Sequence, residues 1–244
     1  MRVSVITVCR NAGDFLLPTL KSIAAQTEAE FESIIVDGAS TDGSVDVIKS
    51  FAAESAFPVK WVSEPDGGVY AALNKGIRKA TGDVVGLLHA GDRFADPHIL
   101  RNVSTSFMCP ATDFLYGDVN YVEYSTGRCR RNYRSDRFQP RMLLNGFAPP
   151  HPSLFVRREL FDSVGMYSED YKVAADFEFL VRLMLVSQSK GRYLPAVMVN
   201  MEPGGLSSRL VNRLWTNNKE KLRALRQNGY RVMPLRLLLR YLYL

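Results

Sequence analysis

Cysteine is scarce in this 244-residue chain, which contains only Cys9, Cys109 and Cys129. The three are far apart, odd in number and without a CxxC spacing, so the sequence indicates neither a disulfide framework nor a zinc site. A reducing, cytoplasmic setting is the simplest expectation. Long apolar runs are also missing, since no segment reaches the length of a membrane-spanning helix. The first residues, MRVSVITVCR, are too short and too strand-like for a signal peptide.

The excess of basic residues is mild. The net charge is +6 and the isoelectric point is about 9.3. Such a balance favours anionic partners, namely nucleotide phosphates, anionic lipid or nucleic acid. Because no recognised nucleic-acid module accompanies the charge, we do not expect a nucleic-acid binder.

Segments typical of strands and helices alternate through the first half of the chain. This alternation argues for strands joined by right-handed crossovers, so we predict an α/β fold with a Rossmann-like, mostly parallel central sheet flanked by helices. Asp14 and Ser44 are candidate N-caps. The expected strands are 2–8, 31–37, 59–64 and 83–88, and the expected helices are 13–26, 45–54 and 69–80.

The rhythm changes after about residue 113. We expect one domain over 1–205, with halves at about 1–110 and 111–205, and a C-terminal basic, amphipathic helical extension over 206–244. The elements expected in the second half are a hairpin over 113–135, a strand near 152–157, an amphipathic helix over 176–186 and a strand over 192–202.

Four polar clusters fall where the predicted strands end. Ligands of open parallel sheets bind beyond the carboxyl ends of the strands. Each cluster alone is most simply a loop, because Gly, Asp, Asn and Ser form turns, but four on one rim indicate a binding site. The clusters are TVCRN, VDGASTDG, SEPDGG and HAGD, which begin at residues 7, 36, 63 and 89.

The second cluster suits a nucleotide base. Asp37 can accept a hydrogen bond from a base N–H, and Gly38 lets a flat ring approach the backbone. GASTDG is neither a Walker A loop nor GxGxxG, which argues against P-loop and dinucleotide chemistry. Lys75 can face the same rim, although a solvated helix lysine explains it equally well.

Asp92, in the fourth cluster, is the candidate ligand for Mn²⁺ or Mg²⁺. A divalent ion on a nucleotide takes few protein ligands, because phosphate oxygens and water complete its shell. One carboxylate can therefore suffice, although an Asp in a Gly-Asp turn is the commoner explanation of this residue alone. His89 can assist, although a packed histidine is the commoner role at a strand end.

Asp176 opens the helix expected over 176–186. An acid at a helix start commonly caps it. A base that takes a proton from a sugar hydroxyl must be a carboxylate near the reacting carbon. Asp176 is the best such candidate if the rim binds a sugar nucleotide, since Glu178 points elsewhere on the helix.

In their joint order these motifs resemble glycosyltransferase family 2. The resemblance extends to about Met201. It implies a GT-A fold and an inverting transfer from a nucleotide-diphospho-sugar, with a UDP-sugar favoured by family habit. The segments that carry it are SVITVCRNAGDFLLPTLKSIAAQT, IIVDGASTDGS, SEPDGGVYAALNKGI, LLHAGD and, on the acceptor side, HPSLFVRRELFDSVGMYSEDYKVAADFEFLVRL.

The resemblance also implies roles for individual residues. The backbone around Thr7 and Val8 would hold the base together with Asp37, while Asp92 would bind the metal and Asp176 would act as the catalytic base. The residues that it implies elsewhere around the nucleotide sugar are Asn11, Asp66, Asn74 and Lys75, and from the residue-level arguments above we add Gly38 and His89. His151, which begins HPSLF, is expected either at the edge of the acceptor pocket or in a structural turn.

The chain departs from the family pattern at Gly91, where many relatives have an acid that often contacts ribose or sugar. We expect this change to affect ribose binding and donor choice rather than the type of reaction. His89 replaces a more usual Asn. The QxxRW motif of processive synthases is absent, so we expect one sugar to be added per encounter.

Only the pattern of charged residues gives information about the acceptor substrate and the cellular location. The segment RCRRNYRS can face an anionic or lipid-linked acceptor, or form a solvated hairpin. The tail with Arg236 and Arg240 can lie on an anionic membrane, or pack on the domain or on another subunit. We expect a glycan or lipid-linked acceptor in surface polysaccharide synthesis of the bacterial type. We also expect a cytoplasmic protein with peripheral contact at the inner face of the cell membrane.

Two other functions stay open at this point. Gly91 makes a catalytically degenerate nucleotide-sugar binding protein conceivable. A sugar nucleotidyltransferase is the second, although TVCRNAGD fits its Gly-rich phosphate loop poorly. The oligomeric state is also open.

Overall fold

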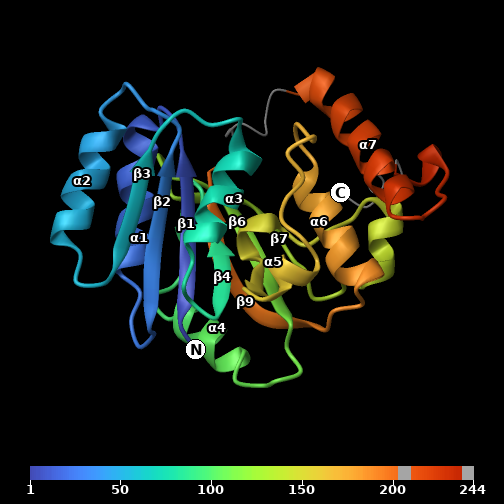
Figure 1. Cartoon of the computed structure of the whole chain (residues 1–244), viewed down its shortest axis with the longest axis horizontal. Helices are drawn as coiled ribbons and strands as arrows, with labels where there is room; N and C mark the ends of the chain where they lie inside the picture. The colour runs from blue at the N-terminus through green and yellow to red at the C-terminus, as the bar shows by residue number, and fades with distance from the viewer. Residues whose placement is uncertain (203–209, 238–244) are drawn as a thin grey trace.

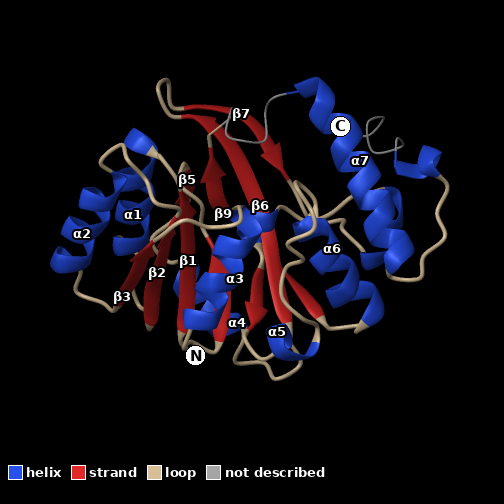
Figure 2. Cartoon of the chain, turned by 45° about the horizontal axis from the view of Figure 1, so that its top comes forward, coloured by secondary structure: helices blue, strands red, loops and turns tan. Residues whose placement is uncertain are grey.

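The computed structural model describes residues 1–202 and 210–237, with side chains excepted at 210–215. In this part, nine strands form one sheet in the order β3-β2-β1-β4-β8-β6-β9-β5, with β7 paired to β6 (Figure 2). The strands are β1 (Val3–Cys9), β2 (Phe31–Asp37), β3 (Val59–Ser63), β4 (Val84–Leu87), β5 (Asp92–Phe94), β6 (Phe114–Glu123), β7 (Arg128–Tyr133), β8 (Phe155–Arg157) and β9 (Gly191–Met201). The helices are α1 (Leu16–Ala24), α2 (Ser44–Glu54), α3 (Val69–Lys79), α4 (Ile99–Ser106), α5 (Leu160–Ser163), α6 (Ala175–Val181) and α7 (Leu210–Gln227).

The first four strands form the parallel half of the sheet, and helices cover both of its faces (Figure 1). Every residue of β1 is buried, and alternate side chains point to opposite faces. Ile6 and Val8 share a core with α3 and α6, whereas Val3 and Val5 share one with α1, α2 and α4. Burial on both faces explains the continuous apolar run that predicted this strand.

The second half of the sheet is mixed. β8 is antiparallel to both β4 and β6, β9 is parallel to β6, and β5 is antiparallel to β9. β6 and β7 form the expected hairpin, with an irregular register between Tyr121 and Val122. The predicted α/β fold with a central sheet flanked by helices is confirmed, and the parallel pairing dominates only in its first half.

Two local predictions, the N-caps, were wrong. Asp14 lies inside a short 3-10 helix, Gly13–Phe15, and makes no side-chain cap. Ser44 is the first residue of α2, and its hydroxyl donates to the Asp42 carboxylate at 2.6 Å. Asp92 closes a turn, since its backbone N–H donates to the His89 carbonyl at 2.9 Å, and it also begins strand β5, which pairs with β9 from far along the chain.

The described part of the C-terminal extension contains α7, which packs on α6 (Figure 1). The expectations for 203–209 and for the last residues from 238 onward, Arg240 included, fall outside the described residues. None of the described helices has the length and apolar character needed to cross a membrane.

Candidate active site

The loops that follow β1 and β2 are joined by hydrogen bonds. Asn11, at φ 48°, donates its backbone N–H to the Ser40 hydroxyl at 2.7 Å. Its side-chain oxygen accepts the N–H of Thr41 at 2.8 Å. The N–H of Gly13 donates to the Asp42 carboxylate at 2.8 Å. The side chain of Asn11 therefore helps to fix the shape of this rim.

Asp37 ends β2 with a carboxylate that is buried among protein donors. It accepts the N–H of Ser40 at 2.9 Å, the hydroxyl of Ser40, the hydroxyl of Ser63 at 2.6 Å and the thiol of Cys9 at 3.5 Å. The parallel register places Cys9, Asp37 and Ser63 in one row. Burial raises the pKa of Asp37, but the hydrogen bonds outweigh burial and hold the pKa below its ordinary value. Asp37 thus organises the rim, and its contact with a base stays a prediction.

Gly38 and Asp66 are neighbours across the rim. A Cβ atom at Gly38 would lie 2.7 Å from Asp66 Oδ2, so a larger residue would require the Asp66 side chain to shift. Asp66 in turn accepts the N–H of Gly68 at 2.9 Å, directly before α3. The absence of a side chain at Gly38 therefore lets the turn after β3 close against the end of β2.

Thr7 and Val8 lie where β1 loses one of its neighbours. The pairing of β1 with β4 ends at Ile6, whereas the pairing with β2 continues to Cys9. Within the described part of the chain, the buried hydroxyl of Thr7 has no hydrogen-bond partner. The divergence of β4 opens the edge of β1 at the position where a base is predicted to bind.

The two predicted polar residues of α3 already have protein partners. Asn74 is buried; its amide donates to the Tyr167 carbonyl at 2.8 Å and to Glu169 at 2.9 Å, and accepts the Tyr167 N–H at 3.0 Å. Lys75 forms an ion pair with Glu64 at 2.6 Å. Asn74 therefore ties α3 to the segment before α6, and the nucleotide roles of both residues stay predictions.

Asp92 is in the opposite situation to Asp37. Asp92 is only 7% exposed, and no described cation pairs with its carboxylate. Burial raises the pKa of Asp92 to about 7, although a hydrogen bond from the His89 backbone lowers the pKa. A divalent cation would stabilise such a carboxylate, so Asp92 fits a metal ligand. The described residues contain no group of three or more acidic, His or Cys side chains that could hold a metal, so substrate and water would have to complete the shell.

The backbone conformation at position 91, next to Asp92, is one that glycine adopts readily. Gly91 has a φ of 99°, a conformation that side chains rarely adopt, and its N–H donates to the Thr19 hydroxyl at 3.0 Å. The same hydroxyl donates to the Asp92 carbonyl at 2.7 Å. An acid at position 91 would strain this turn.

A row of rings connects the loop after β4 with the start of α6. The ring centroids of His89 and His151 are 6.0 Å apart, and His151 shares a hydrogen bond of 2.9 Å with the Tyr167 hydroxyl. Burial lowers the pKa of both histidines, to about 3 for His89, while the charge of Asp176 opposes the shift at His151. Burial and the charge of Asp176 also raise the pKa values of Tyr70 and Tyr167. Asp176 therefore lies within electrostatic reach of His151 and both tyrosines.

The start of α6 is held in place from α7. The carboxylate of Glu220 accepts the backbone N–H groups of Lys172, Val173 and Ala174 at 2.9, 2.9 and 3.0 Å. These groups lie directly before Asp176 in the chain. The role of Glu220 was not predicted from the sequence, because a single acid in a basic helix carries no local signal of such a role.

Glu178, which was predicted to point away from Asp176, has a structural role. It is buried and pairs with Arg182 at 2.8 Å. The guanidinium of Arg182 also donates to the carbonyls of Val164, Gly165 and Met166. Asp176, in contrast, is half-buried and has no ion pair with a described residue. Of the two acids, Asp176 is therefore the one without an ion pair to a described residue, and its role as a base stays a prediction.

Comparison with known proteins identifies relatives that match most of this chain. The sequence model of the family described as "Glycosyl transferase family 2" matches residues 4–168. The chain is 33% identical over 213 residues to a protein of Mycobacterium bovis named "PGL/p-HBAD biosynthesis glycosyltransferase", a match that covers 86% of this chain and 80% of the relative. It is 35% identical over 194 residues to an uncharacterized glycosyltransferase of Mycobacterium tuberculosis, covering 76% of this chain and 70% of that one.

Solved structures share the fold at low sequence identity. Residues 1–349 of TarS of S. aureus, in complex with UDP-GlcNAc, superpose with a TM-score of 0.72 at 18% identity, covering 95% of this chain and 68% of that fragment. A mannosyltransferase from Pyrobaculum calidifontis, in complex with GDP-Man and Mn²⁺, has a TM-score of 0.66 at 20% identity and coverages of 95% and 66%. These likenesses show that the sheet and its helices have the GT-A arrangement.

Proposed function

The chain belongs to glycosyl transferase family 2, and from that premise we propose an inverting transfer of one sugar from a UDP-sugar to a glycan or lipid-linked acceptor. It is a glycosyltransferase that uses a nucleotide-sugar donor. The observation that supports the finer proposal is the contact of His89 with His151, because it joins the loop of Asp92 to the surroundings of Asp176. In a direct displacement, the base at the attacking hydroxyl and the acid that would hold the metal on the leaving diphosphate must lie on opposite sides of one anomeric carbon.

The donor is proposed to lie along the ends of β1, β2 and β3. The opened edge of β1 at Thr7 and Val8 offers backbone groups to the base, and Asp37 holds the loops that frame it. Asn11 and Asp66 stand on the two loops that close the rim, with Gly38 between them. This half of the site binds and orients, and contributes no proton transfer.

Asp92 is proposed to hold Mn²⁺ or Mg²⁺ together with the diphosphate of the donor. Held by Asp92, such an ion would supply positive charge against the charge that develops on the leaving diphosphate. A related fold has been solved with GDP-Man and Mn²⁺, which supports the use of a divalent ion. The carboxylate of Asp92 provides a negative group that has no cation of its own among the described residues.

Asp176 is proposed to remove the proton of the acceptor hydroxyl as that oxygen attacks the anomeric carbon. The bond to the diphosphate breaks through a transition state with oxocarbenium character, as in glycoside chemistry generally. His151 and Tyr167 would fix the acceptor side of this position, since they lie within reach of the Asp176 charge. Both histidines are neutral at pH 7, so they add no competing positive charge.

A pair of variants tests the base assignment. General-base help is worth about 10²–10⁴ in rate, so Asp176→Asn should reduce transfer by that factor while a UDP-sugar still binds. Asp170→Asn, a change at an exposed acid before the same helix, is the matched control and should transfer at the parent rate. Transfer by Asp176→Asn at the parent rate would reject the assignment.

A thermal-shift screen tests the donor and separates the alternatives. UDP-, GDP- and dTDP-sugars, each with and without Mn²⁺, should raise the melting temperature in the order of their affinities when compared at equal concentration. A preferred donor that is neither transferred nor hydrolysed would favour a degenerate binding protein. Formation of a UDP-sugar from UTP and a sugar phosphate would favour a nucleotidyltransferase.

The biological setting is proposed from the relatives. The name "PGL/p-HBAD biosynthesis glycosyltransferase" and the mild basic charge support a bacterial pathway that builds surface glycans or glycolipids, on the cytoplasmic face of the membrane. Sedimentation with anionic vesicles would test the membrane contact, and light scattering would test the oligomeric state.

A further inference from the structure

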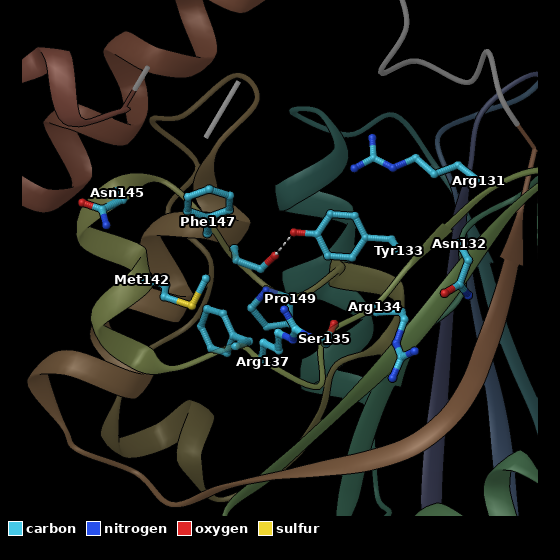
Figure 3. Close-up of a pocket in the computed structure, with 12 residues that line it drawn as sticks. Arg131, Asn132, Tyr133, Arg134, Ser135, Arg137, Met142, Asn145, Phe147 and Pro149 are labelled. Carbon is cyan, nitrogen blue, oxygen red and sulfur yellow. Dashed lines mark hydrogen bonds between the residues drawn. The ribbon is translucent and has the colours of Figure 1, made fainter. Parts of the chain in front are cut away.

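A cavity of about 520 Å³ lies between β7 and the chain that runs from Ser135 to Pro149 (Figure 3). Three arginines line it, Arg131, Arg134 and Arg137, and none of its described lining residues is acidic. We refer to it as the arginine pocket. Arginine presents a planar fork of donors that matches carboxylate and phosphate oxygens, so the lining favours an anion.

Much of the positive charge in the arginine pocket is not balanced by the protein. Arg134 pairs with Asp136 at 2.9 Å. Arg131 lies near the ring of Tyr133, with its guanidinium carbon 5.4 Å from the ring centroid, and within the described chain neither it nor Arg137 pairs with an acid. Two of the three guanidiniums are therefore available to an anion from solution.

The opposite wall of the arginine pocket is apolar. Met142, Phe147 and Pro149 lie across from Arg131 and Arg134 in Figure 3. A free inorganic anion would gain nothing from this wall. An anion attached to an apolar or aromatic body would gain about 25 cal/mol for each Å² that it removes from water.

A buried donor without a partner adds to this argument. Ser135 lines the pocket and is only 2% exposed, and its hydroxyl has no hydrogen-bond partner in the described part of the chain. Its backbone N–H is used, since it donates to Asp118 at 2.7 Å. Buried hydroxyls are rarely left without partners, so a ligand oxygen would satisfy this one.

The arginine pocket adjoins the helix that carries the proposed base. Lys221 of α7 donates to the carbonyl of Gly146, which lies between the lining residues Asn145 and Phe147, at 2.8 Å. The same ammonium lies 4.5 Å from the ring centroid of Phe177, the residue after Asp176. The wall then continues through Pro150 into His151.

We infer that the arginine pocket binds the anionic group, a phosphate or a carboxylate, of an amphipathic acceptor whose apolar part lies against Met142, Phe147 and Pro149. This inference rests on the proposed function, because it assigns the acceptor of that transfer. It places the anion on Arg131 and Arg137 and the reacting hydroxyl toward Asp176.

Phenyl phosphate is the probe, because it joins a dianion to an aromatic ring. Its binding is measured by NMR titration against the full chain, beside inorganic phosphate and benzyl alcohol. We expect phenyl phosphate to bind more tightly than either fragment. The double variant Arg131→Gln, Arg137→Gln should lose at least about tenfold in affinity. Arg141→Gln, a change at an exposed arginine outside the pocket, should bind like the parent.

Three results would overturn the inference: no saturable binding up to about 10 mM, equal affinity of the double variant, or equal affinity of inorganic phosphate. Vesicles containing phosphatidylglycerol distinguish a membrane source of the anion. Vesicle binding that depends on both arginines, without any phenyl phosphate binding, would also contradict the pocket. The thermal shift with UDP-sugars is recorded on the parent and on the same variants. The absence of a shift in the parent would reject the proposed donor, and it would leave the result for anion binding unaffected.

Discussion

Asp37 and Asp92 follow strands of the same parallel half-sheet, and both are buried, yet their surroundings are opposite. Asp37 receives four hydrogen bonds from three residues, and its pKa is held below the ordinary value. Asp92 has no cation beside it in the described structure, and burial raises its pKa to about 7. The number of donors, rather than burial itself, decides whether a buried acid is complete within the protein or needs a partner from outside.

The same contrast distinguishes the two acids at the start of α6. Glu178 is paired with Arg182, whereas the carboxylate of Asp176 has no described ion pair. The protein therefore builds its frame from satisfied acids, Asp37 and Glu178. Asp92 and Asp176, which have no ion pair with a described residue, are the two acids that we propose for metal and substrate.

The largest expected effect is at Asp92. Asp92→Asn should lower metal-dependent transfer by at least about a hundredfold, since a metal supplies several kcal/mol of charge stabilisation. Without metal, its free energy of unfolding at pH 7 should equal or exceed that of the parent, because a buried charge is removed. Activity against Mn²⁺ concentration and urea unfolding measure both effects. Asp96→Asn, an exposed change nearby, is the control, and an unchanged Mn²⁺ response at Asp92→Asn would break the comparison.

Glu220 is expected to come next. Glu220→Ala frees three N–H groups before Asp176, and the loss of alignment should lower kcat by about 10–100-fold while KM for the donor stays within twofold. Lys219→Ala, at an exposed position on the same helix, should match the parent. A parallel loss of donor affinity would mean that Glu220 supports the fold as a whole rather than the position of Asp176.

Asp37→Asn should affect stability rather than metal use. An amide places N–H donors against the hydroxyl and N–H donors that Asp37 now accepts, which should cost about 1–3 kcal/mol of unfolding free energy. Chemical unfolding measures this change, and the Mn²⁺ response per folded molecule should persist. If Asp37→Asn were as stable as the parent, its four donors would not explain its low pKa.

The smallest effect is expected at Glu32, at the other end of β2. Its side chain pairs with Lys60 at 2.9 Å and with Arg2 at 3.5 Å. Burial raises its pKa, but hydrogen bonds from Lys60, Ser4 and Thr81 outweigh burial and hold the pKa at about 2. Because the folded pKa lies below the ordinary 4.5, the stabilisation is complete above pH 4.5 and is lost as the pH falls toward 2.

Glu32→Gln tests this pH dependence. At pH 7 the variant should be less stable by about 1 kcal/mol, since the two partly exposed cations can be solvated. The difference should shrink in urea titrations run between pH 4.5 and pH 2. A difference that is the same at pH 7 and pH 2.5 would exclude the ionised carboxylate as its source.

Some parts of the site were predictable because their signals are local. The apolar run of β1 and the polar residues after it identify a strand end wherever they occur. Gly91 was noticed as a departure, and its φ of 99° now gives a backbone reason for the glycine. Asn74 and Lys75 were expected to face a nucleotide, but nothing in the helix predicted the segment at 167–169 or Glu64 as their partners.

By itself, the sequence determined the parallel half-sheet, the rim of polar loops and the family, because hydrophobic periodicity and turn residues act over a few positions along the chain. Only the tertiary structure decided that β5 would form against β9, that Glu220 would hold the start of α6 and that Asp37 would be satisfied while Asp92 was not. These outcomes depend on residues that lie tens of positions apart in the chain. The charge state and freedom of a carboxylate are set by whichever donors the fold places beside it.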